Sequence, residues 1–293
     1  MQTKRDRLIF LHRIPMLSRQ KIYQLQAYDP TLQTIFNSTP SEVSQLLHIP
    51  MKHSISIYQT IRNSSFINQI KKDEDNITII TQEDEAYPDS LRDIPDAPLV
   101  LYLVGDQTLL QSNYMLSVIG TRKPSEEAFQ KLSHIVKPLI KAGWIIVSGL
   151  AYGIDSYAHE LTVQNHEKTI AVLGSGFYHI YPKAHTNLCR RIARNGLLVS
   201  EYPPIVQPRK HHFPERNRII SGLSEGTLVI EAAEKSGTMI TVDQALDQGK
   251  DIYAVPGSPI IPQTIGCNRL IQDGAKLVIS ATDILEEWPI NQV

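Results

Sequence analysis

The chain has 293 residues, and its 29 lysine and arginine residues against 30 aspartate and glutamate residues leave a formal net charge of −1. This balance excludes a protein that coats itself in nucleic acid through bulk charge, because such proteins are strongly basic overall. A hydrophobic content of 42% and a charged content of 20% exclude a largely disordered chain. Two cysteines, Cys189 and Cys267, cannot form a disulfide framework, and the N-terminus lacks the apolar stretch of a secretory signal. No run reaches the roughly 18 apolar residues of a membrane span, so we expect a cytoplasmic protein with no membrane association.

Residues 1–75 have the pattern of a small bundle of short helices. Apolar residues recur there at helical spacing, as in Leu8, Leu11 and Ile14, and prolines separate the clusters. The charged run at 71–76 is typical of a linker and equally of a solvated surface turn. We therefore predict a helical N-terminal domain over 1–75, of the SAM-like or helix-hairpin-helix-like kind, and a larger domain over 76–293.

The larger domain alternates short β-rich runs with helix-length segments. The runs are 116–120, 144–149, 169–174, 197–201, 227–231 and 252–257. Segment 126–140 places apolar residues on one face and is expected to stop at Gly143, with a kink or an early end at Pro138. This alternation predicts an α/β fold with a Rossmann-like doubly wound, mainly parallel sheet. Ligands of such sheets bind at the carboxyl ends of the strands.

Glycine-rich loops follow four of the predicted strands. They contain Gly120, Thr121 and Arg122; Ser148, Gly149 and Gly153; Gly174, Ser175 and Gly176; and Ser236, Gly237 and Thr238. Any one glycine is explained as well by the turn itself. Four such loops on one edge favour an anion site, because free backbone N–H groups and helix N-termini attract phosphate. The first turn, GTRKPS, lacks the GxGxxG fingerprint of an NAD site, and no P-loop is present.

Segment 201–224 concentrates positive charge. Its prolines predict a stiff extended loop, and Pro214 suits the first turn of a helix. Arg216 and Arg218 follow at once, where cations are unfavourable unless an external anion is bound. The alternative is that they pair with Glu215 and Glu201, which is easier to accept for one arginine than for both. Over residues 183–218, eight basic residues against two acidic ones leave a net charge of +6.

Aromatic residues lie among these loops, and basic residues interleaved with rings are what single-stranded nucleic acid requires. Phe213, in a polar loop, is the ring we expect to stack on a base, whereas Tyr181, before Pro182, is expected in the core. Conventional catalytic arrangements are missing, and His185 with Cys189 supplies too few ligands for zinc. We therefore expect no catalytic residue, no metal and no cofactor.

The chain resembles the DNA-processing protein A family, also called DprA or Smf, over about residues 80–280. The resemblance rests on ordered motifs that include GTRKPS (120–125), SGLAYGID (148–155), FPERNRIISGLS (213–224) and EAAEKSGTMIT (231–241). It implies a non-enzymatic protein, active as a homodimer, that binds single-stranded DNA. In natural transformation such a protein protects incoming DNA and loads the recombinase RecA onto it. Many relatives carry a C-terminal winged helix, which we do not expect before Val293.

Carried over by position, the resemblance puts DNA-phosphate contacts on Arg122, the glycine loops and Lys210, and a base contact on Phe213. The remaining candidate DNA-binding residues are Ser125, Arg209, Arg216, Asn217 and Arg218. Two alternatives stay open. A nucleoside-monophosphate phosphoribohydrolase would need a PGGxGTxxE motif, where this chain has KSGTMITVD (235–243). A small-ligand sensor would explain the glycine loops but not the basic segment.

Overall fold

The computed structural model describes residues 3–288 and divides the chain into two compact units. The first takes in residues up to Tyr87 together with Pro98–Leu103, and the second takes in the rest. The predicted boundary at 75/76 falls just after the last helix of the first unit, but that unit also contains the strand that follows. The boundary itself stays a prediction.

The first unit is helical, as predicted. Its helices are α1 (Lys4–His12), α2 (Arg19–Tyr28), α3 (Thr34–Asn37), α4 (Pro40–Leu47), α5 (Met51–Ile61) and α6 (Ser64–Glu74). Thr3 and Thr39 begin α1 and α4 with capping boxes, in which each threonine accepts from the backbone three residues on. Strand β1 (Thr78–Thr81) pairs antiparallel with β2 (Val100–Gly105). A buried ion pair between Arg13 and Asp73 ties the end of α1 to α6.

The second unit contains a parallel sheet of seven strands among the described residues. Its strands are β3 (Met115–Ile119), β4 (Ile145–Ser148), β5 (Thr169–Leu173), β6 (Leu197–Ser200), β7 (Gly226–Val229), β8 (Asp251–Ala254) and β9 (Lys276–Leu277). They lie in the order β6-β5-β4-β3-β7-β8-β9, and each neighbouring pair is parallel. The strand order reverses between β3 and β7. The predicted doubly wound, Rossmann-like α/β sheet is therefore confirmed.

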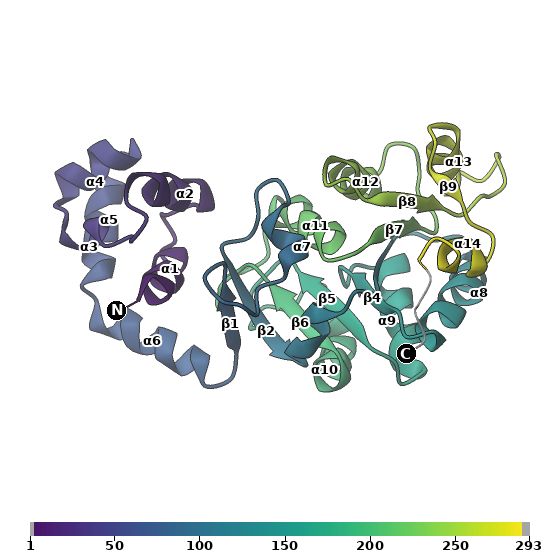
Figure 1. Cartoon of the computed structure of the whole chain (residues 1–293), viewed down its shortest axis with the longest axis horizontal. Coiled ribbons are helices and arrows are strands. Elements are labelled where there is room, and N and C mark those ends of the chain that lie inside the picture. The colour runs from purple at the N-terminus through teal and green to yellow at the C-terminus, as the bar shows by residue number, and fades with distance from the viewer. Residues whose placement is uncertain (1–2, 289–293) are drawn as a thin grey trace. The chain divides into compact units, whose positions relative to one another are not determined.

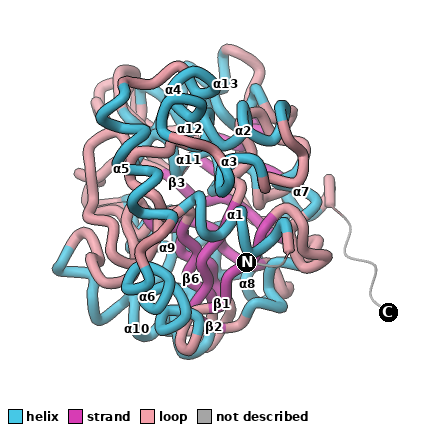
Figure 2. The backbone as a smooth tube through the Cα atoms, turned by 90° about the vertical axis from the view of Figure 1, so that its left-hand side faces the viewer, coloured by secondary structure: helices cyan, strands magenta, loops and turns pink. Residues whose placement is uncertain are grey.

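Helices cover this sheet on both faces. They are α7 (Asp89–Arg92), α8 (Ala128–Lys141), α9 (Ile154–Gln164), α10 (Thr186–Asn195), α11 (His212–Gly222), α12 (Gly237–Asp247), α13 (Ile265–Gln272) and α14 (Thr282–Leu285). Helices α8, α9 and α10 pack in a row on one face, and α11 packs against α12 on the other (Figures 1 and 2). The core between these layers includes Leu132, Leu139 and Trp144, all fully buried. None of the described helices is long and apolar enough to cross a membrane.

Helix α8 differs from its prediction at one point. It continues through Pro138 to Lys141 instead of ending early. Pro138 lies on the exposed side of the helix, between the buried positions Ile135 and Leu139, where the loss of one backbone donor costs least. The predicted stop is confirmed, because Gly143 follows the end of the helix with a φ of +90°.

Candidate functional site

A pocket of about 380 Å³ opens at the carboxyl ends of β3 and β7, where the strand order reverses. This is the position at which open α/β sheets bind ligands. The pocket is bounded by the turn after β3, the first turns of α11 and α12, and the loop before α9. The predicted site residues that line it are Gly120, Thr121, Arg122, Phe213, Arg216, Asn217, Ser236, Gly237 and Thr238.

The rim of the pocket is suited to an anion. Arg122 and Lys123, in the turn after β3, are both exposed. Helix α12 begins at the pocket with no side-chain cap, so its first amides are available at the positive end of the helix dipole. The Ser236 hydroxyl is buried beside these amides and has no hydrogen-bond partner among the described residues. Charge, amides and an unused hydroxyl thus converge on one place.

Arg216 forms the floor of the pocket and is only 4% exposed. Its guanidinium donates to the carbonyl oxygen of Gly149, at 2.5 Å, and to that of Val172. Burial lowers the pKa of Arg216 to about 10, so the side chain stays charged at neutral pH. Burial also raises the pKa of the neighbouring Asp155, although the nearby Arg216 opposes that shift. Arg216 therefore supplies positive charge from beneath the pocket, while its hydrogen bonds satisfy the carbonyl groups of Val172, on β5, and Gly149, just after β4.

Two glycines in the loop after β4 are required by close approach. A Cβ atom at Gly149 would lie 2.5 Å from the guanidinium carbon of Arg216. Gly153 has a φ of +78°, and a Cβ atom there would lie 2.3 Å from the carbonyl oxygen of Thr121. That carbonyl accepts a hydrogen bond from the amide of Ile154, at 3.2 Å. Gly149 thus makes room for the Arg216 guanidinium, and Gly153 lets the α9 end of this loop contact the Arg122 turn directly.

Many of the polar groups predicted to face a ligand from the glycine loops are used inside the protein. The amides of Gly149 and Ala151 donate to the Asp155 carboxylate, and the amide of Gly176 donates to the carbonyl of Val206. The hydroxyls of Ser148 and Ser175 likewise donate to backbone carbonyls. The α12 loop differs, because its helix begins without a side-chain cap and the Ser236 hydroxyl has no hydrogen-bond partner among the described residues, so the four loops are not equivalent. Gly174 contributes in another way, because it packs under the ring of Phe213.

Glu231, fully buried just after β7, holds the turn that carries Arg122. It accepts from the amide of Ser125 at 2.8 Å and from the Ser125 hydroxyl at 2.5 Å. The ammonium group of Lys131 lies 3.0 Å from the same carboxylate. Ser125 therefore positions the turn from behind and does not line the pocket.

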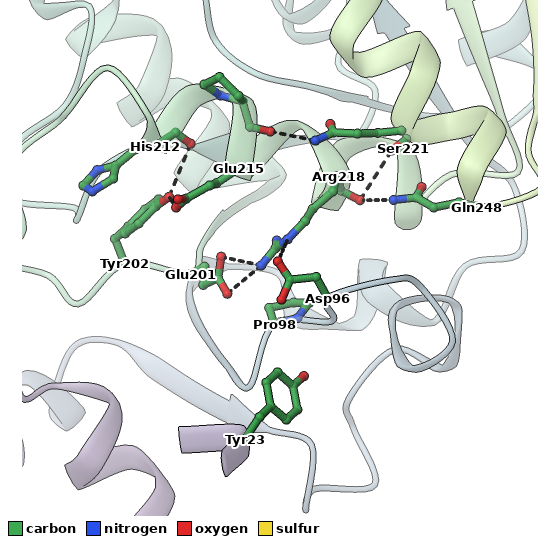
Figure 3. A network of polar contacts seen from close by, with 12 residues as sticks. Tyr23, Asp96, Pro98, Glu201, Tyr202, His212, Glu215, Arg218, Ser221 and Gln248 are labelled. Atoms are coloured by element: carbon green, nitrogen blue, oxygen red, sulfur yellow. Dashed lines mark hydrogen bonds and ion pairs between the residues drawn. The ribbon is translucent and has the colours of Figure 1, made fainter. Parts of the chain in front are cut away.

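Arg218, a predicted DNA-binding residue, faces away from the pocket into a buried ion pair. Two oxygens of Glu201 each lie 2.8 Å from the same guanidinium nitrogen, and Asp96 lies nearby (Figure 3). The sequence left two roles open for Arg216 and Arg218, binding of an external anion or pairing with an acidic residue, and pairing holds for Arg218. It does not hold for Arg216. Glu215 instead accepts from the hydroxyl of Tyr202, at 2.9 Å.

Helix α11 is anchored so that its first turn has a fixed place. Gln244, on α12, and Gln248, which follows the last residue of that helix, donate to the carbonyl oxygens of Pro214 and Arg218. The rings of Tyr202 and His212 stack with centroids 4.0 Å apart. These contacts rigidify the segment that presents Phe213 to the pocket.

The prediction that Tyr181 packs in the core is wrong. The side chain is 51% exposed, and it lies in the loop beyond the end of β5. Its ring contacts that of Phe213 at a centroid distance of 5.4 Å. Arg209 and Lys210 are exposed in the loop just before α11 and do not line the pocket. Their DNA contacts stay predictions.

Two charged lining residues were missed from the sequence, Lys123 and Asp155. Lys123 could have been found, since it directly follows Arg122 in the same turn. Asp155, two residues after Gly153, had the signature of an acid in the first turn of a helix. The described residues contain no group of His, Cys, Asp and Glu side chains that could hold a metal ion. His185 instead contacts the carbonyl oxygen of Leu150 through Nδ1, and Cys189 is buried.

Comparisons with known proteins agree on one family. The model of the family described as DNA recombination-mediator protein A matches residues 78–289. The chain is 46% identical over 220 residues to DNA processing protein DprA of Bacillus subtilis, covering 75% of this chain and 74% of that protein. Its structure is similar to DNA processing protein A of Streptococcus pneumoniae, with a TM-score of 0.83, 34% identity and coverage of 96% and 97% of the two chains. A second solved relative, DNA processing protein A of Helicobacter pylori, is described by its single-stranded DNA binding mode. The TM-score is 0.64 at 30% identity, with 72% of this chain and 94% of that one covered.

Proposed function

Because this chain belongs to the DNA recombination-mediator protein A family, we propose that it binds single-stranded DNA in the pocket between the ends of β3 and β7. The observation that carries the proposal is the convergence there of an uncapped helix N-terminus with exposed and buried arginines. The Helicobacter relative, described by single-stranded DNA binding, supports the choice of ligand.

A phosphate of the strand sits at the first turn of α12 in this proposal. Arg122 and Lys123 approach it from the turn after β3, and Ser236 donates its otherwise unused hydroxyl. Arg216 stabilises the negative charge from below without leaving its own hydrogen bonds. Phe213, at the edge of the pocket, offers its ring to a base, and such stacking contributes about 1–3 kcal/mol per base.

The role that follows is that of a recombination mediator with no catalytic step of its own. The acid in the pocket, Asp155, supports this because its carboxylate accepts from two backbone amides. We extend the proposal to protection of incoming DNA and loading of RecA during natural transformation, with the protein acting as a homodimer. RecA filament formation on single-stranded DNA, followed with and without the protein, tests the mediator step.

The binding site is tested by Arg122→Ala and Lys210→Ala, with Lys137→Ala as a matched control. Lys137 is an exposed cation on α8 and lines neither the pocket at the ends of β3 and β7 nor the hollow beside α10. Fluorescence anisotropy with oligo-dT at several salt concentrations measures how many phosphates are neutralised. Each lost phosphate contact makes the slope of log K against log salt shallower by about 0.7 for single strands. We expect that change for the two site variants and none for the control.

Slopes and affinities of both site variants equal to the wild type would contradict this assignment. A change in Arg122→Ala alone would keep the pocket but remove Lys210 from the interface. Duplex DNA, titrated in parallel, should bind more weakly, since paired bases cannot stack on Phe213.

A further inference from the structure

A second hollow, of about 840 Å³, lies in the same unit beside the loop after β5 and helix α10. It is lined in part by Phe177, Tyr178, Tyr181, Lys183 and Arg190. Tyr178 and Tyr181 are 56% and 51% exposed, although large rings are usually buried. Among the described residues that line the hollow, none carries a carboxylate. Rings and cations without an acid are the combination that a single strand needs.

The two hollows meet at a pair of rings. Phe213 lines the pocket at the ends of β3 and β7, and Tyr181 lines the hollow beside α10. Their ring centroids are 5.4 Å apart, with the planes tilted by 49°. A single strand of DNA with one base stacked on Phe213 therefore has the ring of Tyr181 directly beside that base. The contacting ring pair therefore lies between the two hollows, with one ring lining each.

The cations of the second hollow are available to phosphate. Lys183 and Arg190 are exposed, and within residues 3–288 neither forms an ion pair. The neighbouring Arg191, by contrast, pairs with Glu160 at 2.8 Å. An exposed cation with no acidic partner loses nothing of its own when it binds a phosphate.

We propose that the hollow beside α10 is a second subsite for the same single strand, which crosses the Tyr181–Phe213 ring pair between the two hollows. This inference rests on the proposed function, because it needs a strand in the first pocket. In this proposal the ring of Tyr181 stacks on a base, and Lys183 and Arg190 bind phosphates further along the same DNA strand. The footprint of one protein molecule is then longer than the first pocket alone can hold.

The test compares a short oligo-dT of about 6 nucleotides with a long one of about 20, within the range of single-strand site sizes. The double variant Lys183→Ala/Arg190→Ala should lower the salt slope for the long strand by about 1.4, at 0.7 for each of two phosphates. The short strand, held by the first pocket, should bind the variant and the wild type alike. Tyr181→Leu, which keeps apolar packing against Phe213, should weaken the long strand about tenfold and leave the short one unchanged.

Four results separate the possibilities, with Lys137→Ala as the control for bulk charge. Unchanged long-strand binding in both variants would overturn the second subsite while leaving the proposed function intact. Equal losses for the two lengths would overturn the division into two subsites. A wild-type protein that binds neither strand would overturn the proposed function, and the subsite with it. Loss confined to the long strand, with circular dichroism spectra unchanged, supports the inference.

Discussion

The substitution Gly153→Ala tests whether the site depends on the contact between the loop before α9 and the Arg122 turn. The added Cβ atom would lie 2.3 Å from the carbonyl oxygen of Thr121 and 2.9 Å from the Cα of Arg122. The backbone at Gly153, with φ of +78° and ψ of −127°, also lies outside the regions open to alanine. Something must therefore move, and both neighbours belong to the pocket.

Gly143→Ala is the matched control. Gly143 also has a positive φ, of +90°, but among the described residues, its two chain neighbours apart, a Cβ atom there would meet no atom within 4 Å. A left-handed backbone costs a residue with a Cβ about 1–2 kcal/mol, so we expect that loss in the free energy of unfolding of the control. Forcing an atom into a packed site costs about 1–3 kcal/mol more. Gly153→Ala should therefore lose roughly 2–5 kcal/mol in total.

Urea unfolding curves measure both losses, and anisotropy with oligo-dT, under conditions where each variant is folded, measures the site. We expect the control to bind DNA like the wild type and Gly153→Ala to bind it more weakly, because the Arg122 turn has shifted. The reasoning is refuted if the two variants lose the same free energy of unfolding. If the wild type binds oligo-dT, an equal affinity of Gly153→Ala for the same oligonucleotide would also refute it.

Two further predictions concern buried charges. Glu201→Gln should cost about 3 kcal/mol or more in the free energy of unfolding by urea, because it leaves the buried Arg218 guanidinium with only the more distant carboxylate of Asp96, at 3.8 Å. The corresponding change in the exposed pair Lys141–Glu167, Glu167→Gln, should cost less than about 1 kcal/mol, and similar losses at the two sites would contradict the argument. His159 is fully buried, and burial lowers its pKa from 6.5 to about 3. Between pH 6.5 and pH 3, the imidazole therefore takes up a proton in the unfolded chain but not in the folded protein. Stability should therefore fall with decreasing pH across that window, by up to about 1.4 kcal/mol per unit from this group, and unfolding curves of His159→Gln at pH 7 and pH 4.5 should show a smaller loss than the wild type.

The architecture could be predicted because strand and helix periodicity is local. The run at 169–174 became β5 (Thr169–Leu173), and the apolar face of segment 126–140 became the buried face of α8. The site was predicted at the right edge of the sheet for a related reason, since parallel strands end on one side. Strand order could not be read from these patterns, and it decides that the ends of β3 and β7 adjoin.

The roles of individual polar residues were harder to predict, because they depend on partners far along the chain. Arg216 and Arg218 are two residues apart and look alike in sequence, yet one lies under the pocket and the other is bound to Glu201. Tyr181 was wrongly predicted to lie in the core, because its position before a proline and near a strand does not indicate which residues pack against its side chain. The glycine pattern predicted where the loops lie. It could not predict which of their backbone amides donate hydrogen bonds to the Asp155 carboxylate.

The pairing of β3 with β7 also has a consequence for the order of synthesis. Ile119 and Val229 are neighbours in the sheet, but a helix-rich stretch of chain separates them in sequence, and α12 follows later still. A growing chain that has released β3 through β6 holds Arg122 but lacks the wall made by α12 and the buried Glu231 that fixes its turn. No ligand can use the pocket until both have left the ribosome. Binding at this site therefore requires the chain through the first turns of α12, and truncations before Glu231 should lose the pocket, because they lack both this carboxylate and α12.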